Sequence, residues 1–562
     1  MSNNSNKFIL YDNDDEFKYS KNKAELNIKF NRVAFIFFVF FIISIIYSIH
    51  LIHLGSRKSN QLNDNPSKII SKLHRANIVD RNGNFLAKTV SSIDIGINPV
   101  EIIDPKKLLL NLGYIFPDKN YELFKLKLQK QKFFWFEKKI SEENYEKIMM
   151  LGDKSIKPEE KLVRIYPQKN LFSHIIGQID NDNFGISGLE KSLNEQLKNN
   201  KDTIQLTVDK DIQFLIREEL IKYNEIFRAK GSAAVLINVN TGEIISLVSL
   251  PDFDPNERIK ITDVNYINRA TKGVYEFGSV FKTFTLAAGI HEEVVEPETE
   301  FKNLEKSIRC GKNTISEYDK KIPSNLTAEQ ILIRSGNIGS VRIAQAVGLE
   351  KFKFFLNELS LINPIKFDIN EVGIPVSFRW GKCKLATASY GHGITTTILQ
   401  LANAYSIIVN GGYKISPTLI KKDINLEPKK ILKNGVSNKI NPILRKIVTS
   451  KEGTASLANI EGYEVGGKTG TAQTSKAGGY SKNKINTFAS VFPASNPKYV
   501  LVAMLDEPRT NSEYIYNYRD GSGIKYKGTP YNTAGWTTVE VVGQIIEKIG
   551  PILATKYNEV YQ

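Results

Sequence analysis

Three short motifs follow one another along this chain of 562 residues, and each contains side chains that take part in acyl transfer. Ser279 and Lys282 form S-x-x-K, Ser335 and Asn337 form S-x-N, and residues 468–471 form K-T-G-T. A serine and a lysine one helical turn apart can act as a nucleophile and the base that activates it. The sequence therefore predicts a covalent acyl-transfer site, with Ser279 as the nucleophile and Lys282 as its base.

The order of the three motifs carries more weight than any one of them. S-x-x-K by itself is a weak signal, because the chain contains further matches that begin at Ser20, Ser481, Ser495 and Ser522. K-T-G occurs once, starting at Lys468, and it follows the two serine motifs. The three motifs in this order are typical of enzymes whose serine is acylated by D-Ala-D-Ala peptides or β-lactams.

The residues around the first motif indicate a buried helix. Val280–Ile290 is mostly apolar and Gly278 precedes it as a flexible break, so Ser279 is expected at the N-terminus of a helix. Free backbone N–H groups there favour a developing anion. Lys282 acts as a base only when it is neutral, and both desolvation and a second cation, such as Lys468, lower a lysine pKa. The alternative, a solvated lysine on a helix face, is disfavoured by the apolar neighbours.

The second and third motifs are expected at a helix junction and on a strand. Ser335 and Asn337 lie between two helical stretches, 326–334 and 341–348. Ordinary helix capping is an alternative role for them, because Ser and Asn are good caps. Residues 463–472 are interpreted as a glycine-containing strand that a peptide could approach closely along its edge. A glycine-rich surface turn is the alternative there.

The chain resembles the class B penicillin-binding proteins, the monofunctional peptidoglycan D,D-transpeptidases, over nearly all of the part that follows residue 56. Besides the three motifs, the resemblance rests on segments 75–83, 164–167, 174–177, 185–190, 206–213, 233–251 and 268–270. It implies a multi-domain α/β protein, with a β-lactamase-like transpeptidase domain on an α+β pedestal and one N-terminal transmembrane helix. Phe277 departs from the family pattern, since many relatives have proline there, and this affects the detailed turn before Ser279.

The resemblance implies how an acyl-enzyme would form. Ser279 would attack the penultimate D-Ala carbonyl of a stem peptide, and Lys282 would take its proton. Backbone N–H groups of Ser279 and Thr471 would form the oxyanion hole. Ser335 would relay a proton to the leaving D-Ala, and an amine from a neighbouring stem would then take the acyl group.

The same resemblance implies substrate-binding roles for the remaining motif residues. Asn337 would hold the peptide backbone. Lys468, Thr469 and Thr471 would bind the terminal carboxylate, with Gly470 as part of the same binding strand. No metal or organic cofactor is expected, because acyl transfer of this kind uses only protein groups and the two peptides.

Within class B, the chain resembles the septal, cell-division branch. Asn337 stands where the elongation-type branch usually has aspartate, and segments 389–394, 399–402 and 492–497 also look septal. The resemblance implies peptidoglycan stem peptides and β-lactams as ligands, and other divisome membrane proteins, including a glycan polymerase, as partners. An elongation-type transpeptidase, a D,D-carboxypeptidase that uses water, and a non-catalytic β-lactam-binding sensor or division scaffold stay open as alternatives.

Composition divides the chain into four parts. Residues 1–31 are polar and are expected to form a tail, and residues 32–55 a membrane anchor. The apolar run Val33–Leu54 would span roughly 33 Å as a helix, at about 1.5 Å per residue, which is enough to cross a bilayer. A cleavable signal peptide is the alternative. Residues 56–228 are expected to form the pedestal, a dimerisation-type module, and residues 229–562 the transpeptidase domain.

Positive charges before the apolar run indicate its orientation. Lys21, Lys23, Lys29 and Arg32 precede the run, which places the N-terminus in the cytoplasm. The catalytic domain is therefore expected in the periplasm, on a single pass through the bacterial inner membrane.

The formal net charge of +16 comes with lysines spread along the chain and with no nucleic-acid motif, so nucleic-acid binding is not expected. The six histidines do not cluster at metal-ligand spacing, so no metal site is expected either. Cys310 and Cys383 are the only cysteines, and a disulfide or two buried thiols both fit the sequence. Residues 474–486 are polar and are predicted to form a loop beside the third motif.

Overall fold

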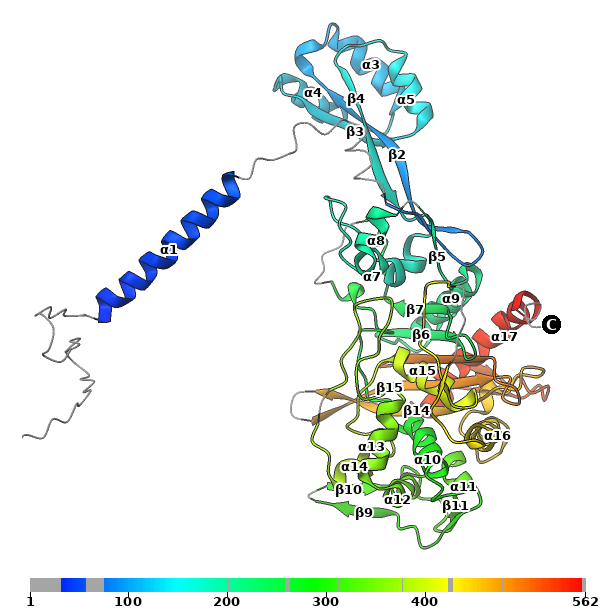
Figure 1. Ribbon diagram of the computed structural model, residues 1–562. Coiled ribbons are helices and arrows are strands. Elements are labelled where there is room, and N and C mark those ends of the chain that lie inside the picture. The colour runs from blue at the N-terminus through cyan, green and yellow to red at the C-terminus, as the bar shows by residue number, and fades with distance from the viewer. Residues whose placement is uncertain are drawn as a thin grey trace, which may run out of the picture. The chain divides into compact units, whose positions relative to one another are not determined.

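The computed structural model describes residues 32–56, 75–200, 202–257, 263–311, 313–376, 378–422, 428–476 and 479–557. The chain divides into two compact units, residues 1–72 and 73–562. In the first unit, α1 (Arg32–Ser56) contains an apolar stretch, Phe35–Ile52, with a mean hydropathy of 2.6 (Figure 1). Its length and composition suffice to cross a bilayer, which confirms the predicted apolar helix. The predicted tail, residues 1–31, lies outside the described residues.

The second unit begins with a small mixed module built on a long antiparallel ribbon. β2 (Phe85–Ile97) pairs along its length with β4 (Ile156–Ile165), and β3 (Phe134–Ile140) pairs with the far end of β2. Three helices, α3 (Pro105–Ile115), α4 (Tyr121–Gln129) and α5 (Glu142–Met149), lie beside that end (Figure 1). Together they bury a separate core of Ile95, Ile97, Leu108, Leu112, Phe124, Phe136, Ile148 and Ile156.

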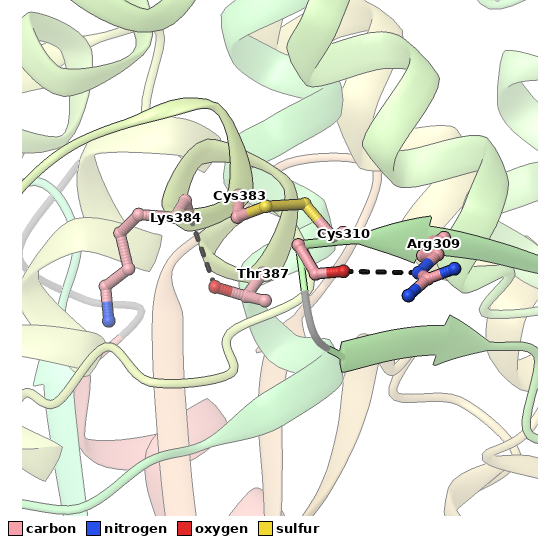
Figure 2. Close-up of a disulfide and its surroundings, with 6 residues drawn as sticks. Arg309, Cys310, Cys383, Lys384 and Thr387 are labelled. Atoms are coloured by element: carbon pink, nitrogen blue, oxygen red, sulfur yellow. Dashed lines mark hydrogen bonds between the residues drawn. A yellow bond between two sulfur atoms is a disulfide. The ribbon is translucent and has the colours of Figure 1, made fainter.

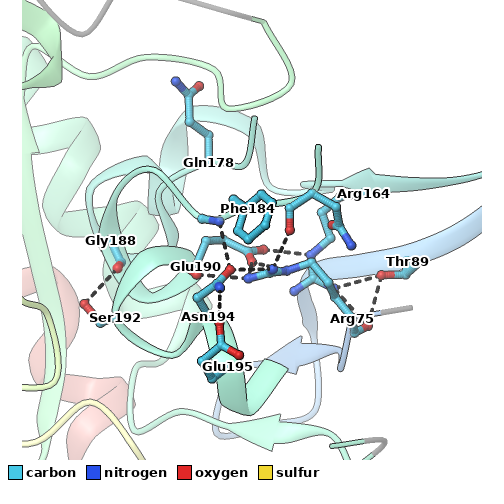
Figure 3. Close-up of polar contacts among 12 residues, drawn as sticks. Arg75, Thr89, Arg164, Gln178, Phe184, Gly188, Glu190, Ser192, Asn194 and Glu195 are labelled. Atoms are coloured by element: carbon cyan, nitrogen blue, oxygen red, sulfur yellow. Dashed lines mark hydrogen bonds and ion pairs between the residues drawn. The ribbon is translucent and has the colours of Figure 1, made fainter. Parts of the chain in front are cut away.

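At the start of β2, β1 (Ile78–Val79) pairs with β2 and with β5 (Ile204–Gln205). The short helices α6 (Ser173–Ile176), α7 (Gly188–Ser192) and α8 (Asn194–Asn199) contact one another in sequence order, and the N–H of Ala76, just before β1, donates to the Leu197 carbonyl on α8. A buried ion-pair cluster joins these segments (Figure 3). Glu190 accepts from Nε of Arg75 at 2.9 Å and from Nε of Arg164 at 2.7 Å, and all three side chains are almost fully buried. Removing one partner from such a cluster leaves an uncompensated buried charge, so the three residues fix α7 against β4 and the start of β1.

A five-stranded antiparallel sheet forms the centre of the remaining chain, in the order β14-β15-β16-β6-β7. The hairpin β6 (Gly231–Asn238) and β7 (Ile244–Leu250) comes first in the sequence, and β14 (Gly466–Lys476), β15 (Gly479–Phe492) and β16 (Tyr499–Asp506) come last. Every residue of β6, β7 and β16 is buried, because helices cover both faces of the sheet. α9 (Lys210–Ile226) and α17 (Thr538–Tyr557) pack together on one face, and α15 (Ile398–Val409) packs on β6 and β16 (Figure 1).

A helical region carries the first two motifs. It contains α10 (Phe281–His291), α11 (Ala328–Ile333), α12 (Asn337–Val347), α13 (Leu349–Glu358), α14 (Lys382–Ala388) and α16 (Val436–Thr449). Short elements complete the chain: β8 (Glu300–Phe301) with β11 (Leu326–Thr327), β12 (Tyr413–Lys414) with β13 (Lys429–Lys430), β17 (Ile515–Asn517) with β18 (Lys525–Lys527), and the 3₁₀ turns 99–101, 169–172, 264–266, 278–280, 456–458 and 534–536.

The two cysteines are joined. The hairpin of β9 (Ser307–Cys310) and β10 (Asn313–Ser316) is linked to α14 by a disulfide between Cys310 and Cys383, whose Cα atoms are 5.5 Å apart (Figure 2). The sequence permitted this bridge but favoured two buried thiols at least as strongly, because it gives no distance between the cysteines.

Two local expectations were wrong. Residues 474–476 and 479–486 are not a loop, because β14 and β15 continue as paired strands through them. The helix expected from residue 326 begins at Ala328, because Thr327 caps it: its hydroxyl accepts from the Gln330 N–H at 3.2 Å, and the Gln330 side chain accepts from the Thr327 N–H. The second helical stretch is longer than expected and begins at Asn337.

Candidate active site

The three motifs meet at one cleft of about 620 Å³. The 3₁₀ turn Gly278–Val280, the turn at 335–337 and strand β14 each form part of its lining, and the predicted residues on its surface are Ser279, Ser335, Asn337, Thr469 and Thr471. Lys282 and Lys468 lie buried beside it. The structure thus brings together residues that are far apart in the sequence.

Two glycines let the turn that carries Ser279 pack directly on β14. Gly278 has φ +58°, and a Cβ on it would lie 2.9 Å from the Thr471 carbonyl oxygen. A Cβ on Gly470 would lie 2.1 Å from the carbonyl oxygen of Phe277, so only glycine fits at this approach. Phe277, the departure from the family pattern, is fully buried. Gly470 therefore has a packing reason for its identity, in addition to the predicted role in the binding strand.

Lys282 is the second residue of α10, and its side chain is only 1% exposed. Its Nζ atom donates to Oδ1 of Asn337 at 2.7 Å and to Oγ of Ser335 at 3.2 Å, as well as to the Ser335 carbonyl. Burial lowers the pKa of Lys282 to about 7, and the charge of Glu317 opposes this shift. The solvated-lysine alternative is therefore wrong, and the amine is neutral for part of the time near neutral pH.

Lys468 approaches the same serine from β14. Its fully buried Nζ atom donates to Oγ of Ser335 at 2.9 Å and to the Thr469 carbonyl at 3.1 Å. Burial lowers the pKa of Lys468 well below its usual range, and the neighbouring charge of Lys282 lowers it further. A hydroxyl has two acceptor lone pairs and one proton. Because the Ser335 hydroxyl accepts from both lysines, its own O–H remains available as a donor.

Ser335 occupies an unusual backbone position. Its φ is +58°, the left-handed region, which costs a non-glycine residue of order 1 kcal/mol or more and is found preferentially at functional sites. It does not cap α12: the N-cap is Gly336, and the first N–H groups of the helix donate instead to the carboxylate of Glu317. The capping interpretation of Ser335 and Asn337 is therefore wrong.

Two threonines of β14 present hydroxyls to the cleft. Oγ1 of Thr469 lies 2.7 Å from Oγ1 of Thr454, and Oγ1 of Thr471 accepts from the Ala534 N–H at 3.0 Å. Thr469 and Thr471 point the same way because they are two residues apart on one strand. Thr454, which the motifs do not include, extends the row of hydroxyls along the same wall.

Tyr390, Gly391 and His392, together with Lys484 of β15, form another part of the cleft wall. Glu276 accepts from the Gly393 N–H at 2.8 Å and from the Tyr480 hydroxyl at 3.0 Å, and Nδ1 of His392 lies 3.7 Å from the same carboxylate. His392 lines the cleft and packs on the ring of Tyr480, with ring centroids 4.7 Å apart, and burial lowers its pKa. This wall thus has its own polar network beside the turn that carries Ser279.

The sequence offered no signal for Glu317, Thr454, Glu276 or Tyr480, because each acts through a fold contact with a distant motif. Chemically, the arrangement provides a hydroxyl on the cleft, a buried amine with a lowered pKa one helical turn away, a second serine between two lysines, and hydroxyls beside the second buried lysine. These groups suit attack on an acyl carbonyl next to a carboxylate.

Comparison with known proteins agrees with this chemistry. The family model "Penicillin binding protein transpeptidase domain" matches residues 232–521, and the model "Penicillin-binding Protein dimerisation domain" matches residues 71–224. The chain is 30% identical to "Probable peptidoglycan D,D-transpeptidase FtsI" of Caulobacter vibrioides, over 86% of this chain and 82% of that protein. It is 29% identical to "Peptidoglycan D,D-transpeptidase FtsI" of Buchnera aphidicola, over 78% and 83% of the two chains. It is also 30% identical to "Stage V sporulation protein D" of Bacillus subtilis, over 78% and 75%.

Proposed function

The chain belongs to the class B penicillin-binding proteins, and from that membership we propose that it is the peptidoglycan D,D-transpeptidase of the division septum, acting through an acyl-enzyme on Ser279. The predicted family and fold class are confirmed by the transpeptidase and dimerisation models that match most of the chain. The observation that carries the proposed chemistry is the buried Nζ of Lys282, which is bound to Asn337 and Ser335 and whose pKa burial lowers to about 7.

Acylation of Ser279 is the first half of the proposed reaction. Neutral Lys282 takes the hydroxyl proton as Ser279 Oγ forms a bond to the penultimate D-Ala carbonyl carbon. The resulting oxyanion accepts from the backbone N–H groups of Ser279 and Thr471, which the packing of Gly278 against Thr471 brings near one another. Ser335, between the two lysines, passes a proton to the leaving amine of the terminal D-Ala as the carbon–nitrogen bond breaks, and the proton on Lys282 replaces it.

Substrate binding uses the other motif residues. The hydroxyls of Thr469 and Thr471, with the buried amine of Lys468 beside them, suit the terminal carboxylate of the donor peptide, and Gly470 lets the strand approach the Ser279 turn. The amide of Asn337 faces both the cleft and Lys282, which suits contact with the peptide backbone.

Transfer to an acceptor is the second half. An amine from a neighbouring stem attacks the acyl carbonyl and gives up a proton to Lys282, the Ser279 Oγ–carbon bond breaks, and Lys282 returns a proton to the serine. Every step uses protein groups and the two peptides alone. β-Lactams inhibit by acylating the same serine, because their ring carbonyl takes the place of the D-Ala carbonyl.

The septal assignment and the location rest on Asn337, on segment 389–394, on similarity to two proteins named FtsI and on α1. We place the catalytic part in the periplasm, with α1 in the inner membrane and the N-terminus in the cytoplasm, where divisome proteins and a glycan polymerase are the expected partners. A periplasm-dependent reporter is expected to work after residue 562 and to fail at residue 1, and the reverse would contradict this orientation.

The test of the activity is cross-linking of a lipid-linked precursor by the purified full-length protein together with a glycan polymerase. Wild type is expected to form cross-linked dimers and to be labelled by a fluorescent penicillin, whereas Ser279→Ala is expected to do neither while keeping its thermal unfolding profile. Labelling without cross-linking would support the sensor or scaffold alternative, and release of D-Ala without cross-links would support a carboxypeptidase.

A further inference from the structure

The N-terminus of α12 is bound by a carboxylate that none of the three motifs contains. Glu317 directly follows β10, and its two oxygens accept from the Asn337 N–H at 2.7 Å and from the Ile338 N–H at 2.8 Å. The carbonyl oxygen of Ser316 accepts from Nδ2 of Asn337 at 2.8 Å. Two consecutive residues of one hairpin therefore hold both the main chain and the side chain of Asn337.

This double contact orients the amide of Asn337. Because its Nδ2 donates to Ser316, its Oδ1 points the other way, to Nζ of Lys282 at 2.7 Å. A change in the position of Asn337 would therefore move an acceptor of Lys282 directly. Shifts of about 1 Å in a catalytic group cost on the order of 100-fold in rate.

The carboxylate of Glu317 also acts on Lys282 through its charge. It favours the protonated amine and so opposes the effect of burial on the pKa of Lys282. The other titratable groups at this end of α10 are Lys468 on β14 and Tyr318 beside Glu317. On the helices packed against α10, the titratable groups are exposed or paired: Arg342, Glu350 and Lys353 are exposed, Arg445 donates to the Val465 carbonyl and to Asn459, and the ion pairs are Arg334–Glu452, Lys351–Glu292, Lys429–Glu358, Lys439–Glu296 and Lys446–Glu329.

A disulfide ties the hairpin that precedes Glu317 to the helix that leads into Tyr390, Gly391 and His392 of the cleft wall. Cys310, at the end of β9, is bonded to Cys383 on α14 (Figure 2). α14 leads into Ser389, whose carbonyl accepts from the Thr285 hydroxyl on α10 at 2.6 Å. The N–H of Glu317 itself donates to the Lys306 carbonyl at 2.9 Å, so Glu317 continues the pairing of this hairpin.

We propose that Glu317 is a positioning residue for acylation: it holds Asn337 with its amide oxygen toward Lys282 and supplies a negative charge that acts on the buried amine of Lys282. This inference rests on the proposed function, since it assigns Glu317 a part in the activation of Ser279. Glu317 itself touches neither substrate nor the reacting atoms and acts only through Asn337 and Lys282.

The experiment compares three variants of the full chain: Glu317→Gln, Glu317→Asp and the control Asp319→Asn, which removes a carboxylate two residues away. The rate of acylation by a fluorescent penicillin is measured across pH, with thermal unfolding recorded for each protein. Glu317→Gln is expected to lower the acylation rate on the high-pH plateau of the profile ~10-fold or more. The reason is that the substitution replaces one of the two oxygens that accept from the α12 N–H groups by an amide nitrogen, which is a donor. The substitution should also move the rising limb of the profile to lower pH, because Lys282 loses the charge that favours its protonated form.

Glu317→Asp keeps the charge on a shorter side chain, so it should lower the plateau rate while the limb stays at its wild-type pH. Asp319→Asn should match wild type in both. If the rising part of the pH–rate profile of Glu317→Gln stays at its wild-type pH, Glu317 has only a structural role and the proposal is overturned. A shift of the rising part in Glu317→Asp would overturn it as well. Penicillin labelling that persists in Ser279→Ala would instead overturn the proposed function. If Ser279→Ala fails to label while Glu317→Gln keeps the wild-type rate and pH profile, only the role of Glu317 is overturned.

Discussion

Lys282 and Lys468 come from a helix and from a strand, and their Nζ atoms donate to one oxygen, Oγ of Ser335, at 3.2 and 2.9 Å. Both side chains are buried, so two cations cannot share this site at low cost. The pair is therefore expected to hold fewer than two charges near neutral pH. A neutral amine at Lys282 is what general-base activation of Ser279 requires.

Lys282→Arg is predicted to slow acylation at least ~100-fold, the usual contribution of a general base. A guanidinium stays protonated and needs a different shape of site. The rate of labelling by a fluorescent penicillin measures the effect. Lys351→Arg, at an exposed lysine on α13 that pairs with Glu292, is the matched control and should label at the wild-type rate. Near-normal acylation by Lys282→Arg would mean that another group is the base.

The pH dependence of acylation follows from the same pKa. Burial lowers the pKa of Lys282 to about 7, so the neutral fraction grows as the pH rises through about 7. The acylation rate of wild type is expected to rise over this window and to level off above it. Stopped-flow measurement with a chromogenic β-lactam between pH 5.5 and 9 tests this. A rate that falls as the pH rises through neutrality would show that the protonated lysine is the active form.

The disulfide should matter for stability. Cys310 and Cys383 are 73 positions apart in the sequence. Closing a loop of that length lowers the entropy of the unfolded chain, which raises the free energy of unfolding by about 4 kcal/mol in the chain-entropy model. The double variant with serine at both positions is expected to unfold at lower temperature and lower urea concentration than the oxidised wild type. Wild type treated with a dithiol reductant should match the double variant. Equal stability of all three proteins would show that the bridge contributes nothing.

The three motifs and the helix after Ser279 could be predicted from the sequence, because apolar periodicity and side-chain chemistry are local properties. Glu317 and Glu276 could not be predicted, since each carboxylate acts on a distant segment that only the fold brings near. The loop expected at 474–486 was wrong for a similar reason: in the described residues 474–476 and 479–486, polar side chains lie on strands because β14 and β15 pair with each other, which overrides their weak strand propensity. The disulfide likewise depended on a distance that the sequence does not contain.

The last prediction concerns the contact between the Ser279 turn and β14. A Cβ on Gly470 would lie 2.1 Å from the carbonyl oxygen of Phe277, a backbone atom that cannot move without shifting the turn. Gly470→Ala is therefore expected to displace the turn that carries Ser279 from β14 and to reduce penicillin labelling ~10-fold or more. The matched control is Gly113→Ala on α3, where a Cβ would have its nearest neighbour at 4.0 Å and alanine favours the helix. Full labelling by Gly470→Ala would show that the turn tolerates the shift, and that Gly470 is not needed to place the serine.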